Sequence, residues 1–221
     1  MADGTVITIS KTGQSVDPNI IQFADENVKK LCVGMWDTNG DLELSYDEAA
    51  TVTSLGATFT GNSEIQIFNE LKHFTGLTVL DDAFSGCSNL WKVTIPVNVE
   101  SMTFNNFKGC SSLEMITFEK GSKLESISGV RDLGAFDGAI NLTTVDMSEC
   151  TQVKRIDEYT FYGNSNLRLF KIGTEIPPTC KDYTFYNINP YSVLKVPSGC
   201  TDAYKKATGW KKFASITGLD E

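Results

Sequence analysis

The sequence predicts an α/β repeat protein, in which stacked coils form a solenoid with a parallel β-sheet on its concave face and a helical cap at each end. Two observations predict this fold. Phenylalanine recurs at intervals of 23 to 29 residues, and apolar residues follow each phenylalanine at fixed distances. The segments on either side lack this period and carry helical patterns instead. We therefore expect an N-terminal tail and helical cap over residues 1–67, repeats over 68–198 and a C-terminal cap over 199–221.

The N-terminal segment carries two helix-start signals. Asp17-Pro18 predicts the N-cap and first turn of a helix. One apolar stripe at three-and-four spacing would bury that helix: Ile21, Ala24, Val28, Leu31 and Met35. A second, short helix should begin at a capping box made by Ser45 and Glu48. Residues 68–80 follow as an irregular coil, with Leu71, Leu77 and Leu80 directed inward.

Residues 37–48, between the two predicted helices, match the twelve-residue EF-hand calcium loop, so the cap is EF-hand-like. The ligands would be the side chains of Asp37, Asn39, Asp41 and Glu48 and the carbonyl of Glu43. Leu42 stands where the motif needs glycine, because that position has a positive φ, and we therefore expect a weak, structural Ca²⁺ site. The alternative needs no metal: Ser45 and Glu48 form only a capping box, and Asn39-Gly40 forms a turn.

The repeat is defined by phenylalanines at 84, 107, 136, 161 and 185. Apolar residues follow each of them at offsets of 6, 9 and 11: Leu90, Val93, Ile95; Leu113, Ile116, Phe118; Leu142, Val145, Met147; Leu167, Phe170, Ile172; Tyr191, Leu194, Val196. These offsets spell L-x-x-L-x-L, the core of a leucine-rich repeat. The last two positions alternate as an inward-facing strand does, so the strands should stack into one parallel sheet.

The C-terminal segment should cover the last coil, because each coil of a solenoid is stabilised by its neighbours. Its apolar positions predict a last helical turn and tail with a large aromatic face: Tyr204, Ala207, Trp210, Phe213 and Ile216.

The six cysteines are too sparse for a disulfide scaffold and include no C-x-x-C pair. We therefore expect each of them to be buried as a small apolar side chain. Cys87 and Cys110 occupy the same position in successive coils, about 5 Å apart, which leaves a disulfide between them as an alternative.

The residues between the inward positions of each strand should face outward on the concave side, where solenoids commonly bind ligands. They form a candidate binding strip, which comprises Lys92, Thr94, Met115, Thr117, Thr144, Asp146, Leu169 and Lys171, continued by Val193 and Lys195. We expect Met115, Leu169 and Val193 to be exposed on adjacent strands. They mark either a protein-binding patch or ordinary scattered surface hydrophobes.

Two segments carry a family resemblance. Ala83-Phe84-Ser85-Gly86-Cys87-Ser88-Asn89-Leu90 with Val93-Thr94-Ile95-Pro96, and then Phe107-Lys108-Gly109-Cys110-Ser111-Ser112-Leu113, resemble BspA-like leucine-rich repeats. The resemblance covers roughly residues 68–198, and the ending around Tyr204 and Gly209-Trp210 is similar to that of such proteins. It implies a secreted or surface-attached protein, and some members of that family are adhesins.

Composition excludes several functional classes. A net charge of −9 argues against nucleic acid and anionic membranes as partners. No apolar stretch is long enough to span a bilayer, and Met1-Ala2-Asp3-Gly4 does not begin a secretory signal, so the chain is cytosolic or has lost a leader. His73 is the only histidine and lacks the sequence context of a catalytic triad, so we expect no enzyme.

Four hypotheses stay open, led by a surface module that binds a host or cell-surface protein. A glycan-binding module would show several exposed tryptophans or tyrosines beside aspartate and asparagine, and Trp91 is one candidate. A glycosidase-like enzyme would need two carboxylates in one pocket. A structural spacer would bind nothing. The sequence leaves the oligomeric state open, with a monomer favoured.

Overall fold

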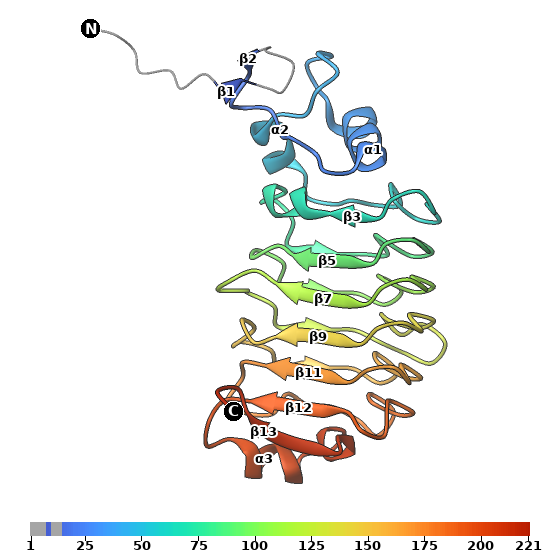
Figure 1. Ribbon diagram of the computed structural model, residues 1–221, viewed down its shortest axis with the longest axis vertical. Helices are drawn as coiled ribbons and strands as arrows, with labels where there is room; N and C mark the ends of the chain where they lie inside the picture. The colour runs from blue at the N-terminus through green and yellow to red at the C-terminus, as the bar shows by residue number, and fades with distance from the viewer. Residues whose placement is uncertain (1–7, 10–14) are drawn as a thin grey trace, which may run out of the picture.

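The computed structural model describes residues 8–9 and 15–221, so Met1-Ala2-Asp3-Gly4 and much of the predicted tail lie outside the described residues. Its main feature is a seven-stranded parallel sheet, whose strands are stacked one per coil along the long axis (Figure 1). The strands are β3 (Ile67–Phe68), β5 (Lys92–Ile95), β7 (Met115–Phe118), β9 (Thr144–Met147), β11 (Leu169–Ile172), β12 (Val193–Val196) and β13 (Ser215–Gly218). The predicted parallel-sheet solenoid is confirmed.

A ladder of phenylalanine rings runs through the core, one ring per coil. Neighbouring rings of Phe84, Phe107, Phe136, Phe161 and Phe185 stack with centroids 4.8 to 5.4 Å apart and planes within 10° of each other. The ladder also extends back to Phe59, which stacks on Phe84 at 5.4 Å. Because each buried ring stacks on the rings of the coils before and after it, burial couples neighbouring coils directly. The first coil therefore includes Phe59, inside the segment predicted as cap.

A second, four-stranded parallel sheet lies in the return segments, where the sequence predicted no strands. Its strands have two residues each: β4 (Val79–Leu80), β6 (Ser101–Met102), β8 (Ser126–Ile127) and β10 (Arg155–Ile156). The second residue of every one is fully buried and faces the core. The extra residues of the longest repeat, around Val130-Arg131-Asp132, follow β8 in a loop.

The prediction that the first helix begins at Asp17-Pro18 is wrong. Helix α1 spans Glu26–Trp36, and the side chain of its N-cap, Asp25, accepts a hydrogen bond from the Asn27 N–H. The segment before it pairs with a distant stretch instead, since the Ile21 N–H donates to the Leu44 carbonyl at 2.9 Å. That non-local bridge occupies the backbone groups a helix would use.

The buried stripe is correspondingly narrower than predicted. Ile21 and Val28 are buried, but Ala24 and Met35 are exposed, and Leu31 is half-buried. Helix α2 (Tyr46–Thr51) starts at the predicted capping box of Ser45 and Glu48, which is confirmed. The short 3-10 helix η1 (Asn69–His73) and strands β1 (Thr8–Ile9) and β2 (Ser15–Val16) complete the N-terminal elements.

The C-terminal segment contains more than the predicted helical turn and tail. Helix α3 (Thr201–Lys206) and the 3-10 helix η2 (Trp210–Lys212) are followed by β13, which contains Ile216 and extends the main sheet. Ile216 therefore belongs to a strand, not to a helical face. Tyr204, Trp210 and Phe213 are buried, so the predicted aromatic face is present.

One of the fifteen predicted inward positions is wrong, because Tyr191 is 83% exposed. In the coil of Phe161 the N–H of Leu167 donates to the Asn164 carbonyl, whereas in the last coil the equivalent bond runs from Ser192 to Asn189, one residue later. Ser192 takes the buried position in place of Tyr191.

All six cysteines are free thiols, so the disulfide alternative is not realised. Five are buried as expected, and Cys200 is half-exposed. Cys87 and Cys110 each donate to a carbonyl one coil back, at Phe59 and Phe84 respectively. None of the helices in the described ranges is long and apolar enough to cross a membrane.

Candidate functional site

The outward side chains of the main sheet form two rows in register. One row aligns Lys92, Met115, Thr144, Leu169 and Val193, and the other aligns Thr94, Thr117, Asp146, Lys171 and Lys195. All ten are half-buried, whereas the side chains between them are buried. We call these ten residues the strand strip. The structure therefore gathers every predicted strip residue on one surface.

Cross-strand bonds hold four of the five side chains in the second row of the strip. The hydroxyls of Thr94 and Thr117 are hydrogen-bonded at 2.8 Å, and Lys171 Nζ lies 2.9 Å from Asp146 Oδ2. Burial alone would raise the pKa of Asp146, but hydrogen bonds from Ser148 and Lys171 hold it below its ordinary value. This row presents fixed polar groups.

The apolar residues of the first row differ from the prediction. Met115, Leu169 and Val193 are half-buried rather than exposed, because neighbouring side chains in the row cover part of each. Thr144 on β9 separates Met115 from Leu169, so only Leu169 and Val193 lie on adjacent strands. The strip is therefore a mixed surface with a divided apolar part.

The EF-hand-like loop is closed by hydrogen bonds of its own. Glu48 Oε1 accepts from the N–H and hydroxyl of Thr38, each at 2.8 Å, and Oε2 accepts from the N–H and hydroxyl of Ser45. These bonds, led by the one from the Ser45 N–H, lower the pKa of Glu48 to about 2. The carboxylate is therefore ionised at neutral pH and joins the two ends of the loop.

Two more of the predicted calcium ligands, Asp37 and Asp41, also accept bonds from the loop backbone. Asp37 accepts from the N–H groups of Gly40 and Leu42, at 2.7 and 2.9 Å, and Asp41 accepts from Glu43. Over residues 8–9 and 15–221, no group of three or more His, Cys, Asp or Glu side chains is placed to hold a metal ion. These hydrogen bonds are compatible with the metal-free capped turn that the sequence left as the alternative. Calcium binding by Asp37, Asn39, Asp41, Glu43 and Glu48 stays a prediction.

Leu42 has the left-handed conformation that its place in the loop requires, with φ of 67° and its side chain 75% exposed. The side chain at that φ costs about 1 to 2 kcal/mol.

His73 has a packing role in the structure. Its ring meets Tyr46 edge-on, with centroids 4.7 Å apart, and burial lowers the pKa of His73 below its ordinary value. This contact joins η1 to α2.

A cluster of four tyrosines, which the apolar pattern of the sequence did not predict, lies on the turns beside the sheet. Tyr159 stacks on Tyr183 with centroids 5.3 Å apart and planes 4° apart, and Tyr162 stacks on Tyr186 at 5.5 Å. Within each coil the two tyrosines are 5.4 Å apart. We call these four residues the tyrosine array. The signal was in the sequence, because the array occupies the positions two before and one after Phe161 and Phe185.

Tyr159 holds a strained backbone position. Its φ is 62°, and the equivalent positions two before Phe84 and Phe107 are held by Asp82 and Asn105, at 48° and 64°. Asp and Asn tolerate this conformation, whereas a bulky residue there costs about 1 to 2 kcal/mol. Strain of this kind is often found at functional sites.

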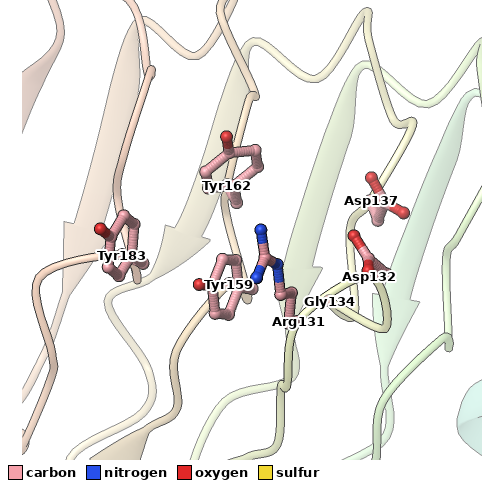
Figure 2. Close-up of a pocket in the computed structure, with 7 residues that line it drawn as sticks. All are labelled: Arg131, Asp132, Gly134, Asp137, Tyr159, Tyr162 and Tyr183. Atoms are coloured by element: carbon pink, nitrogen blue, oxygen red, sulfur yellow. The ribbon is translucent and has the colours of Figure 1, made fainter.

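The array ends at a pocket of about 270 Å³, lined by Arg131, Asp132, Gly134, Asp137, Tyr159, Tyr162 and Tyr183. Figure 2 shows the Arg131 guanidinium between the rings of Tyr159 and Tyr162 and the two carboxylates. Gly134 and Asp137 hold the positions that Tyr159 and Tyr162 hold in the next coil. A Cβ on Gly134 would run into the Tyr159 carbonyl, so the array cannot continue and a hollow remains.

Asp132 and Asp137 are a pair of carboxylates in one pocket, the feature that a glycosidase would need. A general acid of that kind depends on burial among apolar groups to keep its proton at neutral pH. Asp132 is exposed, and the Asp137 side chain is 43% exposed with Lys108 Nζ 3.9 Å away. These surroundings suit hydrogen bonding to a ligand better than acid catalysis.

Comparison with known proteins agrees with the repeat pattern. A family model described as the BspA type leucine-rich repeat region matches residues 77–212 in six copies. A search of curated proteins found no match to this sequence.

Proposed function

The chain belongs to the BspA-type leucine-rich repeat family, and from this premise we propose that it is a non-catalytic surface module that binds a protein through its strand strip. The family is commonly surface-associated, and its repeats suggest protein interaction and are typically non-enzymatic. The observation that carries the proposal is the alignment of ten outward side chains, in two registered rows, on one rigid sheet.

The size of the strip sets the expected strength of binding. The strip spans five strands about 4.8 Å apart and about four residues long, which gives a surface of roughly 19 by 13 Å, or about 250 Å². A standard interface buries about 800 Å² on each partner. A partner that contacts only the strip should therefore bind weakly, and a tight one must also contact surface outside it.

Met115 gives the test of this proposal. Met115→Asp puts a charge into the apolar part of the strip, and we expect it to weaken binding to an immobilised host extracellular-matrix protein at least tenfold, or by about 1.4 kcal/mol. The measurement is surface binding to an array of such purified proteins. Ile176→Asp is the matched control, because Ile176 is 82% exposed in a return segment and should not contact the partner. Equal losses in the two folded variants, or no loss in Met115→Asp, would contradict the proposal.

We propose that the N-terminal helices α1 and α2 cap one end of the solenoid and that residues 199–221 cap the other. At the N-terminal end the ring centroid of Trp36 in α1 lies 6.3 Å from that of Phe59 and 5.3 Å from that of Phe74. At the other end Trp210 lies 5.0 Å from Phe185, the last ring of the ladder. These contacts support the proposal because end coils need a cover to keep their apolar faces from water.

For the loop we propose weak calcium binding, with Kd of about 1 mM, at the weak end for extracellular calcium modules. About 10 mM Ca²⁺ should then stabilise the protein by about 1.4 kcal/mol. Thermal unfolding in Ca²⁺ and in Mg²⁺ measures this, and Glu48→Gln should abolish the calcium-dependent rise in Tm. A wild-type Tm that Ca²⁺ leaves unchanged would mean that Glu48 serves only the capping box.

A further inference from the structure

The tyrosine array is a rigid aromatic surface. It contains four of the chain's seven tyrosines, and Tyr162, Tyr183 and Tyr186 are 37%, 44% and 40% exposed. Mutual stacking fixes the four rings, and Lys212 Nζ lies 5.9 Å from the centroid of Tyr186 at the far end. Stacked phenol rings lose little conformational entropy when a ligand docks on them.

The pocket next to the array offers polar groups that the described part of the chain does not use. Within that part, the Arg131 guanidinium forms no hydrogen bond or ion pair, and the hydroxyls of Tyr159, Tyr162 and Tyr183 form no hydrogen bond. Asp132 and Asp137 add carboxylate acceptors beside them. The pocket thus combines hydrogen-bond donors, acceptors and aromatic rings within one small hollow.

This combination indicates the chemistry of the ligand. Sugar hydroxyls both donate and accept, so they need carboxylates and a guanidinium together, and the C–H groups of a pyranose ring pack on aromatic rings. A phosphate or acidic sugar is disfavoured because the two carboxylates balance Arg131 and Lys108, whose Nζ lies 3.9 Å from Asp137, so the pocket has no excess positive charge. An apolar anchor from a protein is disfavoured because it would bury these polar groups without partners.

From this geometry we infer that the pocket binds a neutral sugar ring of a glycan, with the glycan chain continuing over the tyrosine array. The pocket's 270 Å³ is slightly below the roughly 300 to 1,000 Å³ of pockets for drug-sized ligands, so it admits one or two rings. This site lies on the turns, apart from the strand strip, and does not depend on the protein-binding proposal.

The test uses an array of neutral and acidic oligosaccharides, followed by calorimetry with the best neutral one. The deciding variant is Tyr159→Asn, because Asn105 already holds the equivalent strained position in an earlier coil. We expect Tyr159→Asn to fold with unchanged or higher Tm and to lose at least tenfold in affinity for the oligosaccharide. Arg131→Ala should lose affinity similarly. Tyr191→Ala is the control, since Tyr191 is 83% exposed and outside the pocket.

Three results would overturn the inference: no neutral oligosaccharide bound by the wild type at millimolar concentration, binding unchanged in folded Tyr159→Asn, or binding of acidic sugars alone. Release of new reducing ends from the bound oligosaccharide would also overturn it, in favour of an Asp132–Asp137 glycosidase. Loss of a matrix-protein partner in Tyr159→Asn would show a protein docking on the array instead. If the strand strip proves to bind no protein, the glycan inference still stands, because Met115 does not line this pocket.

Discussion

Phe161→Ala should lower the free energy of unfolding by about 3 to 5 kcal/mol, the cost of deleting a fully buried aromatic ring. Phe161 stacks between Phe136 at 4.8 Å and Phe185 at 5.4 Å, and it meets Phe170 edge-on at 5.3 Å. Removal of this ring interrupts the ladder in the middle of the solenoid, where the coils on both sides pack against it. Because domains are stable by about 5 to 15 kcal/mol, this variant should be close to unfolding.

Urea unfolding followed by circular dichroism measures the loss. Phe104→Ala is the matched control, because Phe104 is 43% exposed and lies outside the ladder. We expect the control to lose less than about 1 kcal/mol. A similar loss in both variants would mean that the ladder does not couple the coils.

Trp210→Ala should have a comparable effect, about 3 to 5 kcal/mol, by uncovering the C-terminal end of the solenoid. Trp210 is fully buried against Phe185 and Tyr204, with centroids 5.0 and 5.1 Å away, and its indole N–H donates to the Pro178 carbonyl at 2.8 Å. The loss should begin locally, so hydrogen exchange should rise first in β12 and β13.

Trp91→Ala provides the control for this prediction, since Trp91 is 42% exposed and near the other end of the sheet. Uniform acceleration of exchange along the whole sheet in Trp210→Ala would contradict a capping role and would point to one cooperative unit instead.

The repeat could be predicted because its signal is local and recurs. Offsets of 6, 9 and 11 from phenylalanine identify the inward positions of a coil without knowledge of any distant contact. The first coil fits this pattern only in part. Buried Ile65 and Phe68 follow Phe59 at offsets 6 and 9, but the residue at offset 11 is Glu70. The buried Glu70 accepts a hydrogen bond from the Ala24 N–H, which is a contact with the N-terminal segment that no periodicity reveals.

The start of the first helix could not be predicted for a similar reason. Asp17-Pro18 and Asp25-Glu26 are both acceptable helix starts locally. Asp25 is selected by its tertiary contacts, because its second carboxylate oxygen also accepts a hydrogen bond from the Gln66 N–H at 2.7 Å. Asp17 instead accepts from Asn19 in a turn, while the residues after it bridge to Leu44 and Tyr46.

The tyrosine array and the pocket at its end could not be predicted from the sequence pattern. The four tyrosines recur at fixed offsets in only two coils, and they become a surface only when those coils place them 5.3 to 5.5 Å apart. The hollow depends further on Gly134, where one missing side chain ends the array. The strand strip could be predicted because outward positions alternate with inward ones, whereas its half-burial depends on neighbouring side chains.

The most direct test of the account is one array that carries matrix proteins and oligosaccharides, probed with the wild type, Met115→Asp and Tyr159→Asn. We expect a protein signal lost only in Met115→Asp and a neutral-sugar signal lost only in Tyr159→Asn, because the two surfaces are separate. If one variant abolished both signals while remaining folded, or if the wild type bound neither class, the chain would not be the two-surface binding module that this account describes.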